Sequence, residues 1–166
     1  AVINLRKSRG LPPAPGQSEL EVQKPLVNID LPLHIGIPAD YIPDKTMRLR
    51  LYRRIADLRH IVEVDALTEE FIDRFGWPPA SVCNLLYQLK IKLLAQMCDI
   101  SSVSSENGQI VIRFMDGSPP EEVPRPYPEF RIGKTAIWMP YRTQADWMDR
   151  LLAYLEKLTK IKEAKG

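Results

Sequence analysis

The chain has 166 residues, of which 45% are hydrophobic and 27% charged, and its 23 basic and 21 acidic residues give a net charge of +2. These values indicate one domain-sized folding unit and exclude the bulk basic charge that marks many nucleic-acid binders. No apolar run approaches the ~20 residues that a membrane-spanning helix needs, and the first ten residues lack the apolar stretch of a secretory signal. We therefore expect a cytoplasmic protein with no membrane partner.

The 15 prolines of the chain are unevenly placed. Pro12, Pro13 and Pro15 precede a glycine and a polar stretch, which predicts an extended linker. Residues 1–9 before them have the pattern of the end of a helix. We expect residues 1–25 to be the end of a preceding domain plus this linker, and residues 26–166 to form the domain itself.

Three helices are expected after an extended segment. Prolines at positions 32, 38 and 43 exclude a helix over residues 26–43. Asp44 is then placed to cap a helix whose apolar residues recur at helical spacing. A second helix is predicted over residues 64–75, ending at Gly76. A third, over residues 79–97, carries apolar residues on enough of its surface to be covered on more than one side.

The pattern then changes to strands. Residues 100–105 and 109–114 flank Asn107-Gly108, a dipeptide that favours a tight hairpin turn. A proline-rich segment, 116–128, separates them from a second hairpin over residues 130–139. A last helix is predicted from about Gln144, with Thr143 and Asp146 at capping-box spacing. The predicted fold class is α+β: helices packed with a small antiparallel β-sheet and a closing C-terminal helix.

Catalytic and metal-binding patterns are not evident. Gly133-Lys134-Thr135 matches the end of a phosphate-binding loop, but Pro128 stands where that motif requires glycine, so we interpret it as a hairpin turn. The two histidines, His34 and His60, lack further ligands at metal-binding spacing. The two cysteines, at positions 83 and 98, are expected to be buried thiols in a reducing compartment. We expect no catalytic, cofactor or metal site.

Charge is segregated between the first two predicted helices. Residues 44–59 carry six bases and two acids, and residues 63–74 carry five acids and one base. One interpretation is an antiparallel helix pair with matching charges along its rim, worth under about 1 kcal/mol per exposed pair. The other is that a charged face contacts another protein. Glu70 and Asp73, three residues apart, would then present adjacent carboxylates suited to arginine.

Three stretches together carry a resemblance: IDLPLHIGIPADYIPD (29–44), RLRLYRRIADL (48–58) and EEFIDRFGWPPASVCNLL (69–86). With them the chain resembles the C-terminal domain of bacterial transcription-repair coupling factors, specifically from residue 27 to residue 114. The resemblance implies that residues 1–25 are the end of a translocase lobe. It also implies a parent protein that uses ATP and Mg²⁺ to translocate on double-stranded DNA and contacts RNA polymerase, with the motor motifs lying outside this chain.

The resemblance further implies a regulatory module. In that family the C-terminal domain docks on an N-terminal UvrB-like module and competes with UvrA for its surface. The residues that match the docking helix are Glu69, Glu70 and Asp73. The alternative function is DNA contact through Arg50, Arg53 and Arg54 on the first helix. Asp57 shares the helical face of these arginines and dilutes its positive charge.

Overall fold

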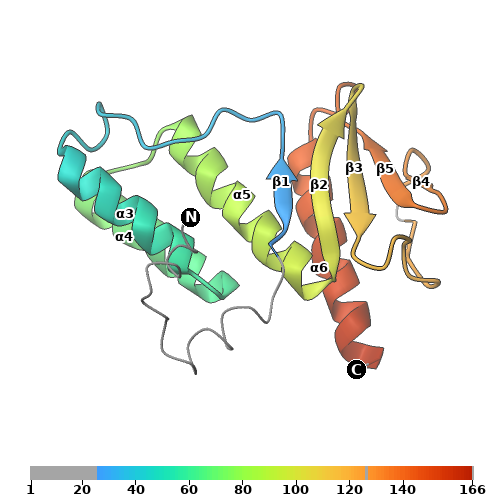
Figure 1. Ribbon diagram of the computed structural model, residues 1–166. Coiled ribbons are helices and arrows are strands. Elements are labelled where there is room, and N and C mark those ends of the chain that lie inside the picture. The colour runs from blue at the N-terminus through green and yellow to red at the C-terminus, as the bar shows by residue number, and fades with distance from the viewer. Residues whose placement is uncertain (1–25, 126, 166) are drawn as a thin grey trace, which may run out of the picture.

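The computed structural model describes residues 26–125 and 127–165, so the linker expected before residue 26 lies outside the described residues. Helices α3 (Lys45–Asp57), α4 (Ile61–Phe75) and α5 (Ala80–Met97) follow the short strand β1 (Asn28–Asp30). Strands β2 (Ile100–Glu106), β3 (Gln109–Phe114), β4 (Arg131–Ile132) and β5 (Ala136–Pro140) precede the closing helix α6 (Trp147–Lys165). The predicted α+β class is confirmed (Figure 1).

The sheet has the order β1-β2-β3-β5-β4. Strands β2, β3, β5 and β4 pair antiparallel, as predicted, and the turn between β2 and β3 has positive φ at Asn107 (51°) and Gly108 (81°). β1, however, pairs parallel with β2, with Ile29 opposite Val103. The sheet is therefore mixed, not wholly antiparallel, because three helices lie between β1 and β2 and return the chain to the same end of the sheet.

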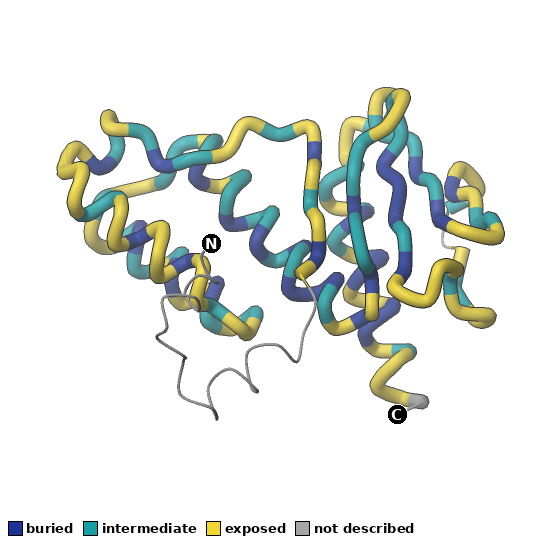
Figure 2. Tube along the Cα trace, in the orientation of Figure 1, coloured by how far each residue is buried: buried dark blue, intermediate teal, exposed yellow. Residues whose placement is uncertain are grey.

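Helix α5 lies between two apolar clusters. On one side Val82, Leu86, Leu89 and Leu93 pack with the buried residues of α3 and α4. On the other, Ile91, Leu94 and Ala95 pack with the sheet and α6. This confirms the prediction that the helix is covered on more than one side, and Figure 2 shows buried positions along its length. The α3–α4 pair and the sheet thus lie on opposite sides of one central helix (Figure 1).

The first two long helices begin where side chains cap them, and for α4 this is not the predicted residue. The Asp44 carboxylate accepts a hydrogen bond from the Thr46 amide (2.9 Å), so the predicted N-cap is confirmed. α4 begins three residues before the predicted start, where Glu63 accepts from the backbone N–H groups of Arg59 and His60.

At the last helix the prediction was three residues early. α6 begins at Trp147, so Thr143 lies too far ahead of it to be its N-cap, and the predicted capping box is wrong. The Asp146 carbonyl, directly before the helix, accepts from the Arg150 amide (3.1 Å). No helix in the described part of the chain is long and apolar enough to cross a membrane.

Candidate functional site: the charged rim of α3 and α4

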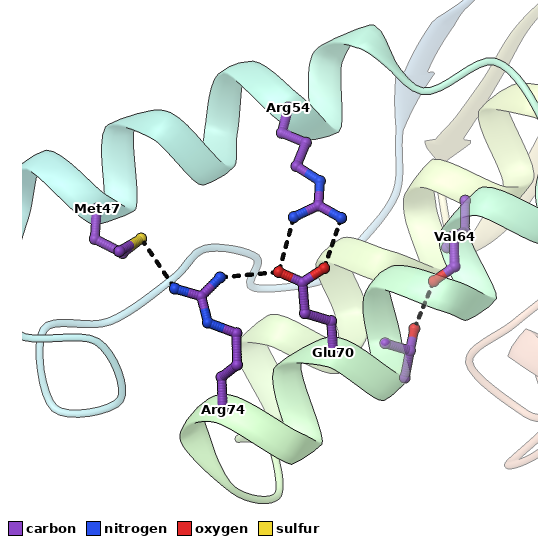
Figure 3. A network of polar contacts seen from close by, with 6 residues as sticks. Met47, Arg54, Val64, Glu70 and Arg74 are labelled. Atoms are coloured by element: carbon purple, nitrogen blue, oxygen red, sulfur yellow. Dashed lines mark hydrogen bonds and ion pairs between the residues drawn. The ribbon is translucent and has the colours of Figure 1, made fainter.

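The rim between α3 and α4 is organised around Glu70. Arg54 on α3 donates two hydrogen bonds to its carboxylate, Nη1 to Oε2 at 2.8 Å and Nη2 to Oε1 at 2.6 Å. Arg74, one turn further along α4, donates to Oε2 at 2.9 Å (Figure 3). The pairing of the two helix rims, one of the two sequence interpretations, is therefore present in the structure.

These contacts shift the protonation equilibrium of the carboxyl group. The hydrogen bonds from Arg54 and then Arg74 lower the pKa of Glu70 to about 2. The Glu70 side chain keeps 28% of its exposure, so solvent still screens the pair. Arg74 also lies over the Phe75 ring, 4.9 Å from its centroid, which holds it against α4.

Glu69 and Asp73, the other two acids matched to the docking helix, are in a different situation. Both are exposed on α4. Neither makes a hydrogen bond or ion pair with any residue that the structure describes. The helical spacing predicts that Glu70 and Asp73 together present adjacent carboxylates to arginines of a partner. Of the three acids matched to the docking helix, Asp73 and Glu69 have no partner among the described residues, whereas Glu70 already has two arginine partners.

The three arginines proposed as a DNA contact are likewise separated. Arg54 faces Glu70, whereas Arg50 and Arg53 are exposed and form no ion pair with any described residue. Among the residues that the structure places, no group of three or more His, Cys, Asp and Glu side chains is arranged to hold a metal ion.

The end of α4 is fixed by contacts that the sequence did not reveal. Tyr41, in the segment before α3, donates its hydroxyl to the Gly76 carbonyl at 2.7 Å. Its ring meets those of Phe71 and Phe75 edge-to-face, at 6.4 Å and 5.9 Å. The extended segment therefore braces the helix that carries Glu69 and Asp73, and the only sequence signal for it was an aromatic residue between two prolines.

The other motifs singled out in the sequence have structural positions. Gly133-Lys134-Thr135 forms the turn between β4 and β5, with the Gly133 amide donating to the Ala136 carbonyl at 2.9 Å, as predicted. Cys98 is buried, as expected. The expectation of burial is wrong for Cys83, which is exposed in the first turn of α5 because it points away from both clusters.

The profile of the TRCF domain family matches residues 31–123, more than half of the chain. This chain belongs to the TRCF domain family. The match includes α3, α4 and the whole charged rim. A transcription-repair-coupling factor of Rickettsia typhi is 40% identical over 98 residues, which are 59% of this chain and 9% of that protein. One from Haemophilus influenzae is 35% identical over 91 residues, 55% of this chain and 8% of that protein.

These relatives are much longer than the matched part, since the chain corresponds to under a tenth of the length of each of these two. A crystal structure of the C-terminal domain of a transcription-repair coupling factor resembles this TRCF domain with a TM-score of 0.70. The similarity covers 86% of this chain and 98% of the other at 22% identity, and so establishes a shared fold.

Proposed function

We propose that this TRCF domain is the non-catalytic C-terminal module of a transcription-repair coupling factor. It docks on the N-terminal UvrB-like module of the same protein and masks recruitment of UvrA until the motor engages a stalled RNA polymerase. The parent would be an ATP-dependent DNA translocase of nucleotide excision repair, acting in the bacterial cytoplasm. The family match supports the assignment of the domain, and the match with longer relatives named transcription-repair-coupling factor supports the parent.

The observation that carries the docking proposal is the pair of unpartnered acids on α4. Asp73 and Glu69 offer exposed carboxylates to arginines of another module. Glu70 can pair with an arginine of another module only if that arginine displaces Arg54 or Arg74. Because the two modules are tethered in one protein, weak contacts suffice: the effective concentration over a short span reaches about millimolar.

The test uses the full-length parent protein. Asp73→Arg combined with Glu69→Arg should release the module, so that UvrA binds more tightly and ATP is hydrolysed faster without RNA polymerase. Coupling of this kind is typically about 1–3 kcal/mol, or up to ~100-fold in affinity. Asp57→Arg with Asp40→Arg is the matched control, since both residues are exposed acids outside α4 and the change in charge is the same.

Deletion of residues 26–166 separates the outcomes. If deletion strengthens UvrA binding and the α4 reversal does not, the mask exists but uses another surface. If deletion leaves UvrA binding unchanged, the masking function is wrong.

The second candidate is DNA contact through α3, favoured by the exposed side chains of Arg50 and Arg53. Phosphate contacts release counterions, so true DNA binding would weaken steeply as salt rises. We expect the chain not to bind a duplex at physiological salt by fluorescence anisotropy. Binding that Arg50→Ala with Arg53→Ala abolishes would favour this candidate instead.

A further inference from the structure

A pocket of about 340 Å³ lies on the side of α5 opposite the charged rim, where the end of β3, the segment after it and the second half of α6 meet. Its inner wall is apolar. Phe114 and Leu158 are buried there, and Ile161 and Val123 are half-buried. The volume accommodates one large apolar side chain, and the wall would remove that side chain from water.

The outer wall, which the proline-rich segment supplies, is fixed in place. At one end the Met115 amide donates to the Asp99 carbonyl at 2.9 Å. At the other end the Tyr154 hydroxyl, from α6, donates to the Pro124 carbonyl at 2.8 Å. Pro119 and Pro120 between these anchors restrict the backbone further. A preformed pocket binds with little loss of conformational entropy, because few groups must be ordered by the ligand.

The mouth of the pocket is acidic. Four acids line it, Asp99, Asp116, Glu121 and Glu122, against one base, Lys162, which is paired with Asp99. Asp116 and Glu121 are exposed and have no ion-pair partner among the residues that the structure describes. An occupant with a positive charge beside an apolar group would bury the apolar group against the inner wall and pair the charge with the acids at the mouth.

We propose that this pocket binds a protein segment in which a large apolar side chain stands next to arginine or lysine. The apolar side chain fills the space between Phe114 and Leu158, and the basic neighbour pairs with Asp116 or Glu121. The residues that line the pocket belong to β3, the segment after it and α6, with Cys98 and Asp99 at the end of α5. Glu69 and Asp73 belong to α4, which lies on the other side of α5 from the sheet (Figure 1). The chain therefore offers a second protein-binding surface that does not depend on the proposed docking through α4.

The test is selection from a phage-displayed random peptide library on the full 166-residue chain, followed by affinity measurement for the enriched peptides. We expect enrichment of sequences with Leu, Ile, Met, Phe or Trp next to Arg or Lys. Replacing that apolar residue by Ala, or introducing Asp116→Lys with Glu121→Lys, should weaken binding about tenfold. The matched control, Asp40→Lys with Asp57→Lys, changes the net charge equally and should alter binding less than about twofold.

Three results would overturn the proposal: no enrichment, enriched peptides that lack the basic-apolar pair, or equal weakening by both charge variants. Sedimentation then distinguishes a separate partner protein from a second copy of this chain as the occupant. A dimer of the unliganded chain that the Asp116→Lys, Glu121→Lys variant dissociates would identify a second copy as the occupant, and the proposal would again be wrong.

Discussion

Arg54 holds Glu70 from the neighbouring helix with two parallel hydrogen bonds, of 2.8 Å and 2.6 Å. The contact connects α3 to α4 at the rim of their shared apolar cluster. A bidentate arginine–carboxylate pair fixes orientation as well as distance. Glu70 is therefore part of the internal framework of this TRCF domain, and the carboxylates left for a partner are those of Asp73 and Glu69.

The pairing predicts an acid-dependent loss of stability. The pKa of Glu70 falls from 4.5 to about 2 on folding, so its ionised form stabilises the native state. That contribution is complete above about pH 4.5 and is lost as the pH falls towards 2. Glu70→Gln should therefore lower the free energy of unfolding at pH 7, by under about 1 kcal/mol for a solvent-screened pair, and less at pH 3.

Urea unfolding of the unmodified chain and of the Glu70→Gln variant, each at pH 7 and pH 3, measures how much stability the variant loses at each pH. Other acids with lowered pKa, such as Glu63 and Glu106, are shared by both proteins and cancel in the comparison. An equal deficit at pH 7 and pH 3 would show that the charge of Glu70 does not stabilise the fold.

Adjacent arginines on α3 give a matched test of the same contact. Arg54→Ala removes both hydrogen bonds to Glu70 and should destabilise the fold by about 0.5–1 kcal/mol. Arg53→Ala, at an exposed position with no ion pair to any described residue, should change the free energy of unfolding little, because arginine and alanine differ slightly in helix propensity. Equal losses in the two variants would contradict the role assigned to Arg54.

Local signals predicted most of this fold, and the failures have physical causes. Asp44, Gly76 and Asn107-Gly108 fix their neighbours through capping and positive φ, so sequence alone placed them correctly. The parallel pairing of β1 depends on the path of three helices, which no local pattern encodes. Likewise, the opposite charges of α3 and α4 predicted a rim contact, but only the packing decides that Glu70 meets Arg54 while Asp73 meets no described residue.

The pocket beside α6 was equally inaccessible to sequence reasoning. The segment 116–128 was expected to be irregular, because its prolines disfavour helix and strand, and its described residues, 116–125 and 127–128, contain neither. Its position against α6 depends on the Tyr154 contact to Pro124, a pairing of residues 30 apart in the chain. Such a contact between distant residues leaves no signature in periodicity or composition.

The two thiols should differ in reactivity. Cys83 is exposed, whereas Cys98 is buried, and that burial raises the pKa of its thiol. A thiol-specific chromogenic reagent should therefore modify one cysteine per chain in the native state and two in denaturant. Cys83→Ser should abolish the native reaction. Rapid native modification of that variant would show that Cys98 is accessible, contrary to the structure.

The turn between β4 and β5 requires glycine for a steric reason. A Cβ at Gly133 would lie 2.5 Å from Cζ3 of Trp138, whose ring covers the turn and carries the Arg131 guanidinium 4.5 Å from its centroid. Gly133→Ala should lower the free energy of unfolding by about 1 kcal/mol, the low end for overpacking, since the half-exposed ring is able to move. Lys134→Ala, at the exposed next position, is the control and should have little effect.

In a Trp138→Leu background the ring is gone, so Gly133→Ala should be less destabilising, and a thermal or urea double-mutant cycle measures the coupling. Additive effects would mean that Trp138 does not constrain Gly133, and the turn would need another explanation for its glycine.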